Sequence, residues 1–187
     1  MGLPADTVTA CLALGANQGD RLAQLRMGYE ALNQHPAIKI TAASPVYASE
    51  AHTWEENDTA PDYLNAVVKA CTALPPETLL RVCQQIERAA GRDRESAAPD
   101  RRWAPRPLDL DILTYARQQI DTQALTVPHP RLGERRFVLQ PWSDIAPNLY
   151  VPPPFDTTVQ ELLQQCSDTA ALRRTPHALD ATSSAPT

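Results

Sequence analysis

Along the first 115 residues, stretches in which apolar residues are continuous or alternate take turns with stretches in which they recur at helical spacing. Short apolar or alternating runs over residues 8–14, 38–47, 63–72 and 108–115 predict four strands. Between them, residues 20–35 and 75–91 place apolar side chains at helical spacing and predict two helices. The order strand, helix, strand, strand, helix, strand is the split βαβ pattern of an α+β, ferredoxin-like sandwich. We therefore expect an antiparallel sheet with both helices on one face and the other face free to carry a site.

The pattern beyond residue 115 is less regular. It predicts a short strand over 118–120 and helical segments over 132–145 and 158–165, separated by the prolines at 152–154. From Thr175 onward, Ala, Ser, Thr and Pro dominate, which predicts a disordered tail over 175–187. The length suits one domain, which we place at residues 1–174.

Composition narrows the class of protein. No apolar stretch approaches the roughly 18 residues of a membrane span, and the start does not resemble a signal peptide, so we expect a cytoplasmic location and no membrane contact. The net charge of −5 disfavours nucleic-acid binding, although arginines cluster locally over 92–106 and 131–136. The four cysteines lack CxxC spacing, which favours reduced thiols over zinc ligands or disulfides.

Asp109 and Asp111 lie two residues apart on the last predicted strand, so both side chains project to the same side. Their Cβ atoms would be about 7 Å apart, a separation that suits a pair of divalent cations. Magnesium fits best because it is commonly held by one or two carboxylates plus substrate phosphates. The alternative is two solvated acids on a surface strand. Replacing either acid should leave the fold intact, because like-charge repulsion is relieved.

Several ordered motifs resemble the 6-hydroxymethyl-7,8-dihydropterin pyrophosphokinase family of folate biosynthesis. The similarity runs from about Val8 to Pro147. Its most specific part is the string APRPLDLDIL at 104–113, and the other parts are LGANQGD at 14–20, YLN at 63–65, IE followed by GR at 86–92, and VPHPR with RRF between 127 and 137.

The resemblance implies transfer of a diphosphoryl group from ATP to the pterin hydroxymethyl oxygen, with release of AMP. It implies two Mg²⁺ ions, ATP as co-substrate and the reduced pterin as second substrate, and we expect a monomer. By the same resemblance, the catalytic residues are Arg92 and Arg106, the metal ligands Asp109 and Asp111, the ATP-binding residues Gln84, Glu87, Ile112, His129 and Arg135, and the pterin-binding residues Tyr63, Asn65, Phe137 and Trp103. We also expect the loop between the two arginines to order when both substrates bind.

The chain departs from the family pattern in three places. Residues 49–60 lack the usual Thr-x-Pro-x-Gly run, residues 95–100 are acidic, and Pro130 stands where some members carry a donor side chain. A catalytically idle paralogue that binds pterin or nucleotide is the main alternative, and the intact arginines and aspartates argue against it. A glycosyltransferase with a DxD motif would need a longer nucleotide-binding domain.

Overall fold

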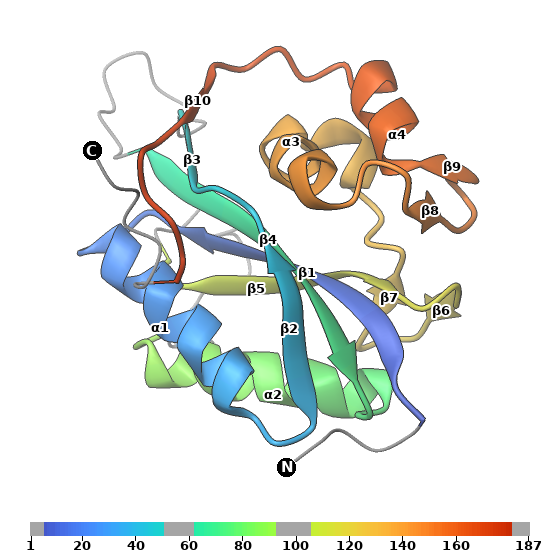
Figure 1. The fold of residues 1–187 in the computed structure, drawn as a ribbon, viewed down its shortest axis with the longest axis horizontal. Coiled ribbons are helices and arrows are strands. Elements are labelled where there is room, and N and C mark those ends of the chain that lie inside the picture. The colour runs from blue at the N-terminus through green and yellow to red at the C-terminus, as the bar shows by residue number, and fades with distance from the viewer. Residues whose placement is uncertain (1–5, 51–61, 93–105, 181–187) are drawn as a thin grey trace.

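A six-stranded antiparallel sheet organises the protein, seen in a computed structural model that describes residues 6–50, 62–92 and 106–180. Its strands are β1 (Val8–Ala16), β2 (Ile38–Ala43), β3 (Tyr47–Ser49), β4 (Tyr63–Thr72), β5 (Asp109–Tyr115) and β10 (Leu172–Arg174). They run in the order β10-β3-β4-β1-β5, and β2 also pairs with β4 (Figure 1). The four strands predicted over 8–14, 38–47, 63–72 and 108–115 therefore meet in the ferredoxin-like order, with β1 and β4 central.

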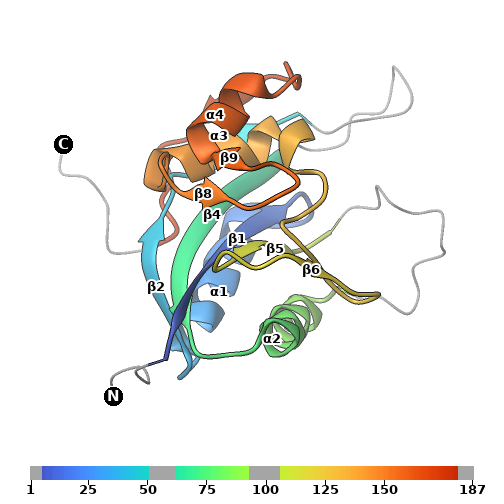
Figure 2. The same cartoon turned by 90° about the vertical axis from the view of Figure 1, so that its right-hand side faces the viewer.

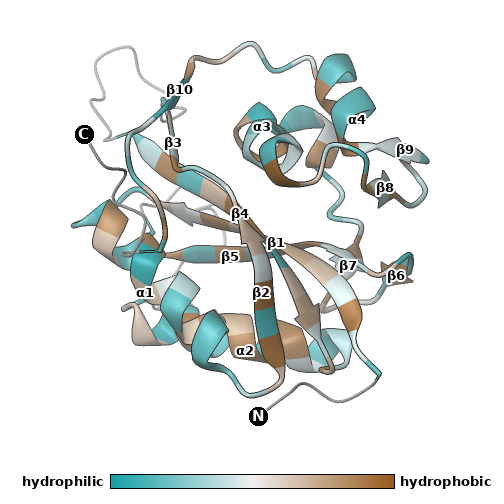
Figure 3. Cartoon of the chain, viewed as in Figure 1, coloured by the Kyte–Doolittle hydropathy of each residue, from teal (hydrophilic) through white to brown (hydrophobic). Residues whose placement is uncertain are grey.

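Two long helices cover one face of this sheet (Figure 2). The first, α1 (Arg21–Gln34), begins where the Asp20 side chain accepts a hydrogen bond from the Ala23 amide at 3.0 Å. The second, α2 (Pro76–Ala89), begins with proline in its first turn and is followed by Gly91 at φ +90°. Leucines 25, 32 and 79 of these helices are fully buried against the strands, whose apolar residues appear brown in Figure 3.

The opposite face is partly covered rather than free. The short 3-10 helix η1 (Leu132–Glu134), α3 (Arg136–Ile145) and α4 (Val159–Gln165) pack over it and form a second apolar core around Trp142. The hairpin of β8 (Tyr150–Val151) with β9 (Thr157–Thr158) joins this second core through Val151, whereas the hairpin of β6 (Ile120–Asp121) with β7 (Thr126–Val127) packs Val127 into the main core. What stays open on this face is the space between the strands and the start of α3.

The strand predicted over 38–47 is two strands. Pro45 has no amide hydrogen and interrupts the ladder between β2 and β3. Ser44 keeps the break attached to β4, because its amide donates to the Val67 carbonyl and its Oγ accepts from the Val67 amide, both at 2.9 Å. The chain can thereby bend and deliver Ser49 to the pocket described below.

The predicted disorder from Thr175 is wrong for residues 175–180. The Thr175 amide donates to the Val46 carbonyl at 2.9 Å, and the Val46 amide donates to the His177 carbonyl at 3.3 Å. Leu179 is 1% exposed and belongs to the main core. One large apolar residue is enough to anchor the segment. Residues 181–187 lie outside the described part of the chain.

All four cysteines are free thiols in the structure. Within the described residues, none of the helices has the length and apolar character needed to cross a bilayer.

Candidate active site

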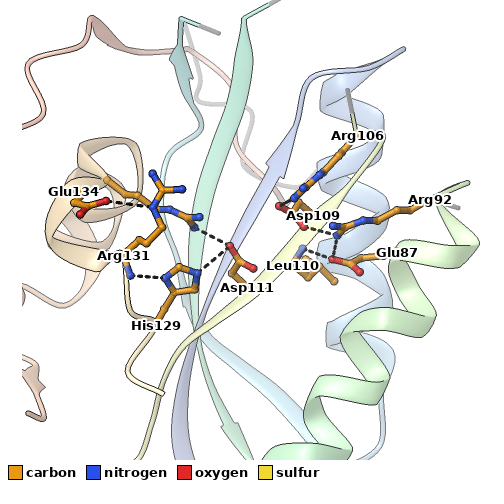
Figure 4. Close-up of polar contacts among 10 residues, drawn as sticks. Glu87, Arg92, Arg106, Asp109, Leu110, Asp111, His129, Arg131 and Glu134 are labelled. Carbon is orange, nitrogen blue, oxygen red and sulfur yellow. Dashed lines mark hydrogen bonds and ion pairs between the residues drawn. The ribbon is translucent and has the colours of Figure 1, made fainter. Parts of the chain in front are cut away.

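Asp109 and Asp111 both open onto the face of the sheet that carries α3 (Figure 4). Their strand, β5, pairs antiparallel with β1, so that Asp109 lies opposite Gly15 and Asp111 opposite Ala13. Leu110 and Ile112 alternate with them and are 3% and 4% exposed in the core beneath the sheet. The period of two therefore brings the carboxylates to one side, as predicted.

The two carboxylates line a cavity of about 340 Å³ between the strands and the start of α3. Seven of the residues singled out from the sequence meet in its lining: Tyr63, Asn65, Arg106, Asp109, Asp111, Arg135 and Phe137. The lining therefore combines aromatic and apolar side chains with charged ones. Such a cavity suits a flat, polar ring attached to an anionic group.

Asp109 is neutralised by arginines from two segments of the chain (Figure 4). Arg92, just after α2, donates to Asp109 Oδ1, and Arg106 Nη1 donates to Asp109 Oδ2 at 2.8 Å. Burial opposes ionisation of this carboxyl, but the two guanidinium groups outweigh burial and hold its pKa below the usual range. Asp109 is therefore ionised at neutral pH.

Arg92 is itself fixed by the fully buried Glu87 of α2. Glu87 Oε1 accepts from Arg92 Nη1 at 2.5 Å and from the Leu110 amide at 2.9 Å. One carboxylate thus connects the helix, the arginine and the backbone between the two aspartates. The predicted contact of Glu87 with ATP is not compatible with this burial, because its side chain is 0% exposed.

Asp111 has a separate set of partners and points toward His129, away from the contacts of Asp109 (Figure 4). Arg135 Nη1 donates to Asp111 Oδ2 at 2.9 Å, and His129 Nε2 lies 3.7 Å from the same oxygen. Burial, together with Arg135, lowers the pKa of His129 and favours neutral imidazole. Because His129 Nδ1 accepts from the Arg131 amide at 3.2 Å, the neutral ring carries its proton on Nε2, which points toward Asp111.

The base of the Arg106 segment is tied to the end of β1. The Arg106 amide donates to Asn17 Oδ1 at 2.7 Å, and the Asn17 amide donates to the Arg106 carbonyl at 3.2 Å. Asn17 is 3% exposed. This two-way connection sets the position from which the Arg106 side chain reaches Asp109.

Comparison with known proteins identifies the family. Residues 11–147 match the family model described as 7,8-dihydro-6-hydroxymethylpterin-pyrophosphokinase (HPPK). The chain belongs to the HPPK family. It is 43% identical over 136 residues to the 2-amino-4-hydroxy-6-hydroxymethyldihydropteridine pyrophosphokinase of Bacillus subtilis, covering 73% of this chain and 77% of that protein. The Haemophilus influenzae enzyme of the same name is 36% identical over 169 residues, covering 90% of this chain and 99% of that protein.

Membership of the HPPK family makes the chain a pyrophosphokinase of folate biosynthesis. Enzymes of this family use ATP as a substrate and normally Mg²⁺. A solved structure of Plasmodium falciparum HPPK-DHPS superposes with a TM-score of 0.62 over 86% of this chain at 15% identity, a likeness that concerns the fold. The present chain spans 43% of the length of that protein.

Not every predicted HPPK site residue reaches the cavity. Among the described residues, Gln84, Glu87 and Ile112 lie outside its lining, and the Ile112 side chain points into the core. Arg92 and His129 also lie outside the lining, but each contacts one of the two aspartates. Trp103 and the loop of residues 93–105 lie outside the described part of the chain.

The structure also adds residues to the HPPK site that the sequence patterns did not single out. Ser49 accepts a hydrogen bond from Asn65 Nδ2 at 2.9 Å and lines the cavity beside it. Asp168 lines the same cavity from a segment beyond α4. A local signal exists for Ser49, which is the first residue of the atypical run of residues 49–60, whereas Asp168 has none.

Proposed function

We propose that the chain transfers the β,γ-diphosphoryl group of ATP to the hydroxymethyl oxygen of 6-hydroxymethyl-7,8-dihydropterin. The hydroxyl oxygen attacks the β-phosphorus, the bond from that phosphorus to the oxygen it shares with the α-phosphorus breaks, and AMP leaves. The hydroxyl proton is released, and the products are AMP and the pterin diphosphate. The observation that supports this reaction best is one cavity in which two carboxylates lie between two separate groups of cationic side chains.

Asp109 and Asp111 are the residues proposed to hold magnesium. Carboxylate oxygens suit this hard cation, and both side chains open into the same cavity. Groups of three or more His, Cys, Asp and Glu side chains placed for metal binding are absent from the described residues, so phosphates and water would complete the coordination. Two bound ions would offset the negative charge of the polyphosphate in the transition state.

Arg92 and Arg106 are proposed to turn from Asp109 to the transferring phosphoryl group. Both guanidinium groups contact Asp109 and neutralise this half-buried carboxylate. When cations and polyphosphate reach that carboxylate, the guanidinium groups can donate to phosphate oxygens instead. The same two arginines thus serve the free enzyme and the reaction.

His129 and Arg135 are proposed to hold phosphate oxygens beside Asp111. Arg135 offers a charged fork, and the neutral His129 ring donates from Nε2. Gln84, half-buried on α2, and the backbone of Ile112 remain predicted nucleotide contacts. The role proposed for Glu87 changes from contact with ATP to fixing Arg92 and the Leu110 amide.

Tyr63, Phe137 and Asn65 are proposed to bind the pterin. The two rings line the cavity and can stack on a flat heteroaromatic ring. Asn65 is 5% exposed and donates to Ser49 Oγ, which leaves its Oδ1 to accept from a pterin N–H. Trp103 remains a predicted pterin contact, and a monomer remains the expected state.

Release of AMP from ATP tests the function. Purified protein with magnesium, ATP and the reduced hydroxymethylpterin should form AMP and pterin diphosphate in equal amounts, and a chelator of divalent cations should stop the reaction. An idle paralogue would instead bind pterin, detected by a change in pterin fluorescence, without releasing AMP. Formation of ADP in place of AMP would contradict the proposed bond cleavage.

A further inference from the structure

The amino end of α3 receives its capping carboxylate from a distant segment. Within the described residues, the side chain at its N-cap, Arg135, makes no capping hydrogen bond. Asp168 Oδ2 instead accepts from the Arg136 amide at 3.1 Å, across 32 residues of sequence. Asp168 Oδ1 accepts from the Ala170 amide at 2.9 Å, which holds the carboxylate in place. A negative charge at this end of a helix is favourable.

The capped amide lies between two residues of the candidate active site. Arg135 donates to Asp111 at 2.9 Å, and Phe137 lines the cavity. The Arg135 guanidinium carbon is 5.9 Å from the centre of the Phe137 ring. Any movement of the first turn of α3 would therefore displace both side chains relative to the cavity.

Asp168 begins a segment, residues 168–174, that we call the C-terminal strap. Asp168, Ala170, Ala171 and Leu172 line the cavity. Its end, β10, pairs with β3 so that Leu172 lies opposite Ser49, the partner of Asn65 (Figure 1). The strap thus reaches from the helix that carries Phe137 to the strand that carries Ser49. These are the two sides of the proposed pterin pocket.

The strap is anchored on the side away from Asp168. Thr175 bonds to the Val46 carbonyl through its amide and through Oγ1, at 2.9 and 2.8 Å. Arg26 Nε donates to the Ala178 carbonyl at 3.2 Å, and Leu179 is buried. Together with the hydrogen bonds of Asp168, these contacts hold the strap at both ends. It lies beyond residues 11–147, the part of the chain that the family model matches.

We propose that Asp168 is a positioning residue for pterin binding and that the C-terminal strap is a wall of the pterin pocket. Asp168 acts through the Arg136 amide on Arg135 and Phe137, and the strap residues limit the space beside the ring. The inference rests on the proposed function, since it assigns the substrate whose affinity the strap controls.

The test compares three variants of the full chain by steady-state AMP release. Asp168→Ala removes the cap, Asp168→Asn keeps one acceptor oxygen, and Thr158→Ala removes a cap from α4, where Thr158 Oγ1 accepts from the Glu161 amide at 3.3 Å. Thr158 is therefore a control for the stability lost with any helix cap. Melting temperatures measured alongside show whether the two Ala variants are comparably destabilised.

We expect Asp168→Ala to raise the KM for pterin about tenfold, as loss of a hydrogen bond to a charged group allows, with kcat within about threefold. Asp168→Asn should restore most of that affinity, and Thr158→Ala should leave the KM unchanged. An unchanged pterin KM in Asp168→Ala, or an equal rise in Thr158→Ala, would overturn the positioning role. A wild type that releases no AMP would instead overturn the proposed function itself.

A second variant tests the wall if Asp168→Ala does not fold. Ala171 is exposed on the strap and lines the cavity, so Ala171→Trp adds bulk without filling a core position. The KM for pterin should rise at least about fivefold while the KM for ATP stays within about twofold. Equal effects on both substrates, or no effect on either, would show that the strap does not bound the pterin pocket.

Discussion

Asp109→Asn should destabilise the protein, and the sign of this effect separates two views of the site. If the paired aspartates mainly repelled each other, removing one charge would stabilise the fold, as the sequence alone suggested. The structure instead places Asp109 between Arg92 and Arg106. Removing its charge leaves two guanidinium groups facing each other with Glu87 as the remaining nearby carboxylate on that side.

The magnitude follows from the contacts that are lost. Hydrogen bonds to charged groups contribute about 1.5–3 kcal/mol each, and Asn keeps one acceptor oxygen for one of the two arginines. The Asp109 side chain is 26% exposed, so solvent screening reduces the remaining loss. We expect the free energy of unfolding to fall by about 1–3 kcal/mol, which shifts the urea midpoint by about 0.5–1.5 M.

The effect should depend on pH in a defined direction. The two arginines hold the pKa of Asp109 below its usual range, so the ionised carboxylate adds stability at pH values above its unfolded-state pKa of about 3.9. That contribution is lost as the pH falls through the lower folded-state pKa. The difference between wild type and variant should therefore be full at pH 7 and shrink below about pH 4.

Urea unfolding followed by circular dichroism, at pH 7 and in steps down to pH 3, measures this difference. Asp111→Asn is the matched comparison, because Asp111 is 33% exposed and has one close arginine, and its loss should be smaller. An Asp109→Asn protein as stable as wild type at pH 7, or more stable, would show that the two arginines do not stabilise the ionised Asp109.

Three further predictions concern other residues of the same structure. Glu87→Leu should lower the free energy of unfolding by about 1–3 kcal/mol in chemical denaturation, because the Leu110 amide loses its acceptor and Arg92 keeps only Asp109, among the described residues, as an acidic partner; an unchanged stability would contradict the buried role. Arg106→Ala should lower kcat by a factor on the order of 10³, because a guanidinium contact to the transferring phosphoryl group is lost. The position of the loop base should not change, because Asn17 bonds to the backbone of residue 106. A change confined to KM would argue against a catalytic role. Burial raises the pKa of Cys11 to about 11, so its thiol should resist alkylation in the native protein at pH 8 and react after unfolding, as mass spectrometry can measure; rapid native labelling would contradict the burial.

Much of the fold was predictable because local periodicity carries it. The alternation of Leu110 and Ile112 with the two aspartates decides which side of β5 enters the core, and burial confirms it. Helical spacing between 20 and 35 and between 75 and 91 likewise located α1 and α2. Such patterns depend on neighbours within a few residues, which the sequence displays directly.

The parts that the sequence did not predict depend on contacts between distant segments. The cap of Asp168 on α3 spans 32 residues, and the Asn17 contact with Arg106 spans 89. Leu179 anchors a segment whose composition is otherwise typical of disorder. The neutralisation of Asp109 was missed for the same reason, since Arg92 reaches it from the end of another element.

The central claim is that the two carboxylates of β5 organise the polyphosphate for attack at the β-phosphorus. Product analysis of Asp109→Ala and Asp111→Ala with ATP, magnesium and the reduced hydroxymethylpterin tests it most directly, with native circular dichroism as the control for folding. Wild type should form AMP and pterin diphosphate, while each folded variant should lose turnover by a factor on the order of 10³ or more. A folded variant that releases AMP at close to the wild-type rate would contradict the claim.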